Sequence, residues 1–114
     1  DVLHAGIHAV EMAYRTGVPM AYGTDLLGTM QRRQSSEFTL RAEAVPAVDL
    51  VRAATINGAR LMRLESEIGQ VKPGFHADLI VVEGNPLEDI GCLAGPEDTL
   101  QLVMQQGGVG SDRR

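Results

Sequence analysis

One carboxylate in this sequence stands where enzymes and metal sites place their reactive groups. Asp25 follows Gly23 and Thr24, directly after the short apolar run 18–22. A run of this length is too short for a helix and predicts a buried strand over about residues 18–23. At the carboxyl end of a strand, an aspartate can bind a metal ion or carry a proton. It can also close a turn or cap a helix, and the residues alone favour the turn.

Two histidines offer a weaker metal site. His4 and His8 stand four residues apart, a spacing that places both imidazoles on one face of a helix. The zinc-protease pattern needs a glutamate directly after the first histidine, and Ala5 stands there, so the general base is absent. We therefore expect solvated helix histidines at both positions, and a structural role for His76.

Other groups carry less chemical information. Arg32 and Arg33 could pair with a substrate carboxylate, but adjacent arginines in a loop are more often solvated. The glycines at 107, 108 and 110 lack the lysine and the following helix of a phosphate-binding loop. Cys92 is the only cysteine, so it forms no disulfide within the chain and has no metal-site spacing.

The elements that would position Asp25 alternate between helix and strand. Apolar residues three and four apart predict helices in the first half, and turn residues bound short apolar runs after Glu67. We expect helices at about 2–16, 37–44 and 59–64, and a further helix that begins at Pro46 and continues until Asn57-Gly58 breaks it. We also expect a long loop at 26–36 and strands at 68–71, 78–83 and 100–104. An α/β half therefore precedes a β half.

Composition excludes several partners. The chain has 114 residues, four aromatic side chains, no tryptophan and a net charge of -5. Nucleic-acid binding is not expected, because it needs basic surfaces and aromatic stacking platforms. No apolar run approaches the ~20 residues of a membrane span, so no membrane partner is expected. No signal peptide is visible, which predicts a cytoplasmic protein, although a chain starting at Asp1 resembles one cut from a longer sequence.

Five linked motifs resemble the carboxyl-terminal part of the amidohydrolase superfamily. In order they are Gly23-Thr24-Asp25, then 53–59, 68–74, Ala77-Asp78-Leu79 and 84–90. The loop 26–38 is most similar to the imidazolonepropionase-related prolidase and Xaa-Arg dipeptidase branch. The resemblance implies an incomplete α/β fold. Its expected parts are the last strand and helices of a TIM-type (β/α)8 barrel at 1–66, part of a small β-sandwich at 67–108, and a disordered tail at 109–114.

The same resemblance implies a hydrolase. It implies cleavage of C–N bonds by metal-activated hydroxide, a divalent metal cofactor of one or two zinc ions, and a small amide, dipeptide or cyclic amide as substrate. Asp25 matches the aspartate that ends the eighth strand in the family, which implies that it is both metal ligand and proton shuttle. The family's other ligands, a His-x-His, a lysine carbamate or glutamate, and two more histidines, have no counterpart in this sequence. Since one carboxylate cannot hold zinc in a four-coordinate site, a fragment of this extent should be inactive alone.

A non-catalytic α/β binding or structural module is the alternative hypothesis. In that case Asp25 would close a turn, and the open edges of the strands would serve association. A homo-oligomer is one way of covering such edges, and the chain's own tail is another. Stoichiometric metal binding would separate the two hypotheses.

Overall fold

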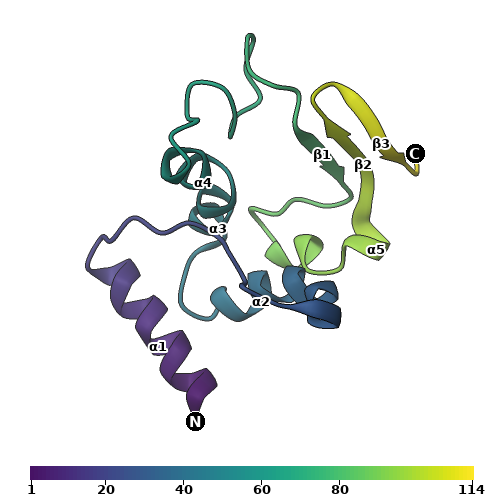
Figure 1. Cartoon of the computed structure of the whole chain (residues 1–114). Helices are drawn as coiled ribbons and strands as arrows, with labels where there is room; N and C mark the ends of the chain where they lie inside the picture. The colour runs from purple at the N-terminus through teal and green to yellow at the C-terminus, as the bar shows by residue number, and fades with distance from the viewer.

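A computed structural model describes the whole chain, residues 1–114, and shows helices in its first half and a sheet near its end (Figure 1). The helices are α1 (Val2–Arg15), α2 (Glu37–Arg41), α3 (Ala47–Ala54), α4 (Ile56–Leu61) and α5 (Pro96–Thr99), with 3-10 segments η1 (Gly28–Ser36) and η2 (Ile90–Leu93). The strands are β1 (Leu79–Val82), β2 (Leu100–Gln105) and β3 (Gly108–Asp112). The predicted α/β class is confirmed at this level. No helix is long and apolar enough to cross a membrane.

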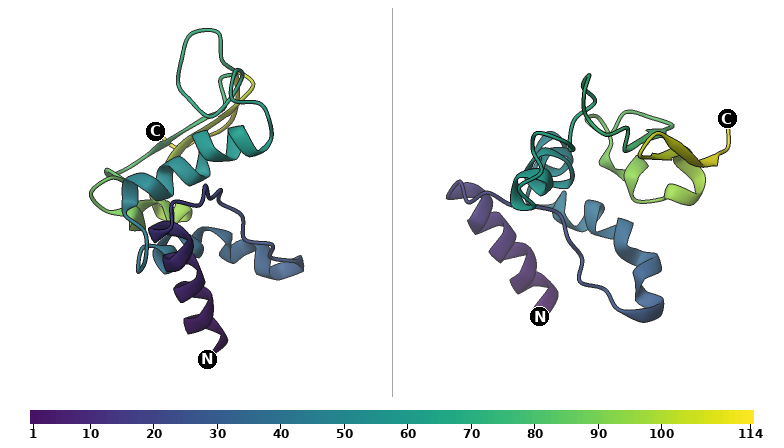
Figure 2. Two further views of the ribbon diagram at one scale, coloured as in Figure 1. Left: turned by 90° about the vertical axis from the view of Figure 1, so that its left-hand side faces the viewer. Right: turned by 45° about the horizontal axis from the view of Figure 1, so that its top comes forward.

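The first helix follows its prediction closely. Its N-cap is Asp1, whose carboxylate accepts a hydrogen bond from the backbone N–H of Leu3 at 3.2 Å. It ends at Arg15 with Thr16 as its C-cap, and Gly17 continues the chain with a φ of 73°, in the left-handed region that favours glycine. Val10 and Tyr14 on one face pack against the core. The N-terminal end of α1 extends below the other elements in the left view of Figure 2, and its residues Leu3 and Ile7 line a pocket together with Leu40 of α2.

Helices α3 and α4 follow one another with a single break at Thr55. The backbone there has φ -124° and ψ -88°, outside the helical region. The sequence placed this break at Asn57-Gly58, two residues later than the structure does. Asn57 instead lies inside α4, where its side chain is free to bond outside the helix.

The three strands form one antiparallel sheet in the order β1-β2-β3. Leu79 lies opposite Met104 in the β1–β2 pair, and Leu102 lies opposite Asp112 in the β2–β3 pair. The predicted disordered tail is therefore wrong for residues 109–112, because they complete the hydrogen bonds along one edge of β2. The outer edge of β1 has no partner strand.

Three other local predictions differ from the structure. Residues 18–23 have no regular secondary structure, because a strand requires a neighbouring strand and none lies beside this segment. Residues 68–70 form a bend and Val71 has no regular secondary structure, so no strand is present at 68–71. The expected loop 26–36 contains η1, whose side chains are mostly exposed.

The core is small. Only six residues are buried: Val45, Leu50, Ala53, Ala59, Ile90 and Leu102. Val45, Leu50 and Ile90 form one cluster, which joins the helices to η2. Meanwhile large apolar side chains such as Val2 and Val71 are 89% and 90% exposed. The radius of gyration is 14.7 Å, above the roughly 13 Å of a compact domain of this length. The elements are therefore arranged more openly than in a well-packed domain.

Candidate functional site

The carboxylate of Asp25 is exposed and has no partner in the chain. Its backbone lies in the left-handed region with a φ of 52°, which aspartate tolerates better than most residues other than glycine. A turn-forming or helix-capping aspartate must accept a hydrogen bond from a backbone N–H. No side-chain hydrogen bond reaches Asp25, and η1 begins after Leu27 without a side-chain cap. Neither structural role considered for Asp25 is realised here.

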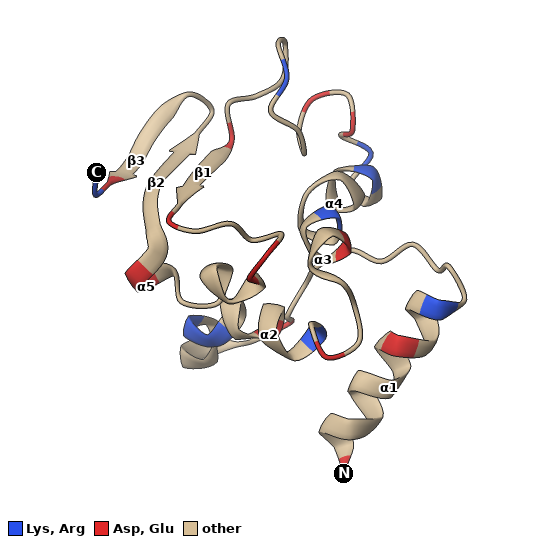
Figure 3. Cartoon of the chain, turned by 180° about the vertical axis from the view of Figure 1, so that it is seen from behind, with Lys and Arg blue, Asp and Glu red and all other residues tan.

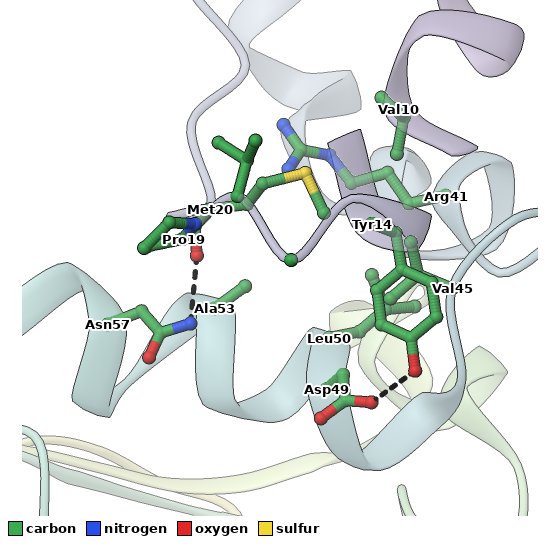
Figure 4. Close-up of a pocket in the computed structure, with 12 residues that line it drawn as sticks. Val10, Tyr14, Pro19, Met20, Arg41, Val45, Asp49, Leu50, Ala53 and Asn57 are labelled. Carbon is green, nitrogen blue, oxygen red and sulfur yellow. Dashed lines mark hydrogen bonds between the residues drawn. The ribbon is translucent and has the colours of Figure 1, made fainter. Parts of the chain in front are cut away.

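The segment that leads to Asp25 is held on one side by the α3–α4 pair. The side-chain amide of Asn57 donates to the carbonyl of Met20 at 2.9 Å (Figure 4). The backbone N–H of Tyr22 donates to the carbonyl of Ala53 at 3.0 Å. Within the segment, the bonded residues are Met20 and Tyr22. Alternate residues of an extended chain present their hydrogen-bonding groups to the same edge, so both bonds lie on one edge. Helix groups therefore do here what a neighbouring strand does in a sheet.

Arg41 of α2 holds the other side of the same segment. Its Nη1 donates to the carbonyl of Ala21 and its Nη2 to the carbonyl of Gly23, each at 3.2 Å. Its Nε donates to a carboxylate oxygen of Glu37 at 2.6 Å, one helical turn earlier. The side chains of Arg41 and Glu37 are only 16% and 22% exposed. On that edge, the guanidinium of Arg41 thus binds the last two carbonyls before Asp25.

The ring of Tyr22 ties η1 to this arrangement. It stacks on Phe38, with ring centroids 4.3 Å apart and an interplanar angle of 21°. The Tyr22 hydroxyl donates to the carbonyl of Gln34 in η1 at 2.5 Å, and the Arg41 Cζ lies 5.2 Å from the ring centroid. Burial, followed by the negative charge of Glu37, raises the pKa of Tyr22 to about 12 against the opposing effect of Arg41.

A cavity of about 160 Å³ lies behind the segment, between α1 and α3 (Figure 4). Its wall includes the Tyr14 hydroxyl, which donates to the Asp49 carboxylate at 2.8 Å. That hydrogen bond, with burial and the negative charge of Asp49 adding to it, raises the pKa of Tyr14. Asp25 is not among the lining residues. The cavity therefore belongs to the packing of the helices rather than to the carboxylate.

The histidines do not gather into a metal site. His4 is 4.0 Å from the carboxylate of Asp1, and His8 is 3.7 Å from that of Glu11, each pair lying along the exposed face of α1. His76 is 3.6 Å from Glu67 in a separate part of the chain. No group of three or more His, Cys, Asp or Glu side chains could hold a metal ion.

The other sequence candidates lie apart from one another. Arg32 and Arg33 form an exposed basic stretch of η1 beside α2 (Figure 3). The glycines at 107, 108 and 110 belong to the β2–β3 turn and to β3. Cys92 is half-buried in η2, and burial, followed by the charge of Asp89, raises the pKa of its thiol.

A comparison with models of protein families shows to which family the chain belongs. The model of the amidohydrolase family matches residues 1–109. The chain belongs to the amidohydrolase family. The resemblance seen in the five sequence motifs is thereby confirmed.

Relatives in this family carry several activities in their names. A 5-methylthioadenosine/S-adenosylhomocysteine deaminase of Symbiobacterium thermophilum is 36% identical and matches 90% of this chain. An ochratoxinase of Aspergillus niger is 29% identical over 80% of the chain. These alignments cover 28% and 19% of the two relatives. This chain therefore spans less than a third of the length of either protein.

Solved structures match the fold closely. An amidohydrolase is 41% identical with a TM-score of 0.91, and a prolidase in complex with N-methylphosphonate-L-proline is 38% identical with a TM-score of 0.88. Both matches cover 96% of this chain and 26% of the other. A Xaa-Pro dipeptidase with bound methionine is 34% identical, with a TM-score of 0.82 over 90% of this chain and 25% of its own.

Sequence reasoning found Asp25 but missed the residues around it. Asn57 was interpreted only as a helix breaker, and Arg41 and Tyr22 only as members of a helix and an apolar run. Asn57 lies within one of the five motifs, so a polar side chain inside a helix of small residues was a usable signal. Arg41 gave no such signal, since its partners Ala21 and Gly23 contribute only backbone carbonyls.

Proposed function

We propose that this chain supplies one part of the active site of a metal-dependent hydrolase that cleaves C–N bonds. The observation that carries the proposal is the unpartnered carboxylate of Asp25, which ends a firmly held segment in a chain of the amidohydrolase family. In this proposal Asp25 is both a metal ligand and the carrier of the proton. Residues 1–66 would form part of a barrel, in which 18–23 would become the eighth strand when neighbouring strands of the complete protein lie beside it, and residues 67–108 would form part of a sandwich.

The donor set fits a divalent metal only in part. An exposed carboxylate with no internal partner has the oxygen atoms that zinc binds. Zinc needs about three or four protein ligands, and the chain gathers no cluster of three. Asp25 therefore fits as one ligand of a larger set, and we propose that the 114-residue chain alone is inactive.

The resemblance to the amidohydrolase family, together with the exposure of its carboxylate, supports a part for Asp25 in the reaction. A bound divalent metal would supply a water of lowered pKa as the nucleophile. Asp25 would accept the proton of that water on a carboxylate oxygen as the water attacks the amide carbon. It would then donate the proton to the amide nitrogen, so that the C–N bond breaks and the amine leaves neutral. The carboxylate ends the cycle ionised, as it began.

The proposed substrate class is supported by the solved structures, whereas several of the curated relatives are deaminases. A prolidase and a Xaa-Pro dipeptidase match 90–96% of the chain at 34–38% identity, and both names indicate dipeptide substrates. We therefore propose that the substrate is a dipeptide or an N-acyl amino acid, and a cyclic amide is the alternative substrate class. The names of the deaminases among the relatives also indicate reaction at a C–N bond, so an adenosine derivative is the substrate with which the dipeptides are compared.

The test uses the complete gene product that contains these 114 residues. The protein would be stripped with a chelator, reloaded with zinc, and assayed on Xaa-Pro dipeptides, N-acyl amino acids and an adenosine derivative. We expect zinc-dependent release of the amino acid from the first two classes. Ammonia release from the adenosine derivative alone would contradict the substrate class. A gene product that binds no stoichiometric zinc and hydrolyses none of these substrates would instead support the hypothesis of a non-catalytic binding or structural module.

A further inference from the structure

We propose that Arg41 is a positioning residue for Asp25, acting through the backbone carbonyls of Ala21 and Gly23. Its consequence for catalysis rests on the proposed function, whereas its effect on the order of Asp25 is a property of the chain itself. The two can therefore fail separately.

The guanidinium of Arg41 has a geometry that matches one edge of the Asp25 segment. Carbonyls two residues apart in an extended chain point to the same edge, so one group can reach both. The planar fork of Arg41 does so, with Nη1 on Ala21 and Nη2 on Gly23 at 3.2 Å each. The compact ammonium of a lysine cannot reproduce a two-point contact of this kind.

The guanidinium of Arg41 is held in place by its own neighbours. The Nε of Arg41 bonds to Glu37 one turn earlier on the same helix, which fixes the plane of the guanidinium. Both side chains are mostly buried, at 16% and 22% exposure, so water competes little with these bonds. The ring of Tyr22, 5.2 Å from the guanidinium carbon, covers a face of it.

The side chain of Asp25 itself makes no hydrogen bond that would fix its direction. Its carboxylate accepts no hydrogen bond, and the nearest helix N-terminus, at η1, has no side-chain cap. The direction of the carboxylate is thus set only by its backbone, which adopts a left-handed conformation with a φ of 52°. On the opposite edge the last bonded group is the N–H of Tyr22, three residues before Asp25. Arg41 is therefore the side chain whose contact lies closest to Asp25 along this segment.

The experiment is a measurement of backbone order by ¹⁵N relaxation on the complete gene product that contains these 114 residues and on its variants. In the wild type we expect order parameters near the ~0.85 of a rigid backbone at Gly23, Thr24 and Asp25. In Arg41→Gln we expect these three to fall below about 0.6, the range of flexible segments, while amides of α1 and α3 keep their values. Arg41→Lys should give intermediate values, because one of the two carbonyl contacts can be kept. A merely structural loss would affect α1 and α3 as well.

Arg15→Gln is the matched control. Arg15 forms an exposed ion pair with Glu11 on α1, and its side chain makes no hydrogen bond or ion pair with the Asp25 segment. Its removal should leave Gly23, Thr24 and Asp25 unchanged. Unchanged order at these three residues in Arg41→Gln would overturn the proposal. If Arg41→Gln fails to fold, Arg41→Lys decides: a folded lysine variant with wild-type order at Asp25 overturns it, and one with selective loss of order supports it.

Discussion

The side-chain amide of Asn57 donates a hydrogen bond of 2.9 Å to the carbonyl of Met20, 37 residues earlier in the chain. This bond joins α4 to the segment that ends at Asp25. The proposed site thus depends on side chains far from it in sequence.

Replacing Asn57 with alanine should lower the free energy of unfolding by about 1 kcal/mol, because the half-buried carbonyl of Met20 loses its donor. Urea unfolding of the 114-residue chain measures the change. Gln31→Ala is the control, since Gln31 is exposed in η1 and its side chain makes no hydrogen bond. Equal stability of the two variants would show that the Asn57 contact contributes nothing.

A second prediction concerns the bend at residues 68–70. Gly69 has a φ of 89°, and a Cβ there would lie 2.8 Å from the Cβ of Ala59 and 3.0 Å from the carbonyl of Thr55. Gly69→Ala should therefore combine backbone strain with a clash, at a cost of about 3 kcal/mol. Gly74 has a φ of 88° with open space around it, so Gly74→Ala should lose only about 1 kcal/mol. A thermal unfolding series that ranks Gly74→Ala as the less stable variant would contradict the packing of this bend.

The two tyrosines give a prediction for alkaline pH. Tyr22 has its pKa raised to about 12, mainly by burial, and Tyr14 has its pKa raised mainly by its hydrogen bond to Asp49. A pKa raised by folding means that the contribution to stability is complete below the unfolded value near 10. That contribution is lost as the pH rises from about 10 through the folded value. Ultraviolet absorbance of phenolate should show a transition near pH 12 that disappears in Tyr22→Phe, and a transition of Tyr22 at its ordinary pKa would contradict the burial of the ring.

A metal prediction follows from the single ligand in the chain. Titration of the 114-residue chain with zinc, followed by calorimetry, should show no stoichiometric site, because no three candidate ligands lie together. Tight binding at one zinc per chain would contradict the described arrangement. It would point to a rearrangement that brings His4 and His8 together with a further ligand.

Local patterns in the sequence predicted much of the fold. Val10 and Tyr14 belong to the apolar stripe that predicted α1, and the run 78–83 predicted β1, because both signals depend on neighbouring residues. The predicted strand at 18–23 is not formed, because a strand depends on a neighbouring strand that can be distant in sequence, and none lies beside this segment. β3 was missed because its residues are glycine-rich and polar, and only pairing with β2 makes them a strand.

The candidate site could be predicted from the sequence only in part. Asp25 could be found because a carboxylate after a short apolar run and a Gly-Thr step is an unusual pattern with chemical meaning. Arg41 could not be found, because contacts to backbone carbonyls place no demand on the identity of Ala21 or Gly23. Its role depends on a tertiary arrangement that spans 18 to 20 residues of sequence.

The most direct test of the central proposal is the turnover number of Asp25→Asn in the complete gene product, reloaded with zinc and assayed on a Xaa-Pro dipeptide. Asparagine keeps the size of the side chain but cannot carry the proton. We predict a fall of about 10²–10⁴-fold, the usual contribution of a general acid–base group. Asp98→Asn is the control at an exposed aspartate of α5 and should keep the wild-type rate. An Asp25→Asn protein with wild-type turnover and zinc content would contradict the role of Asp25 as ligand and proton carrier.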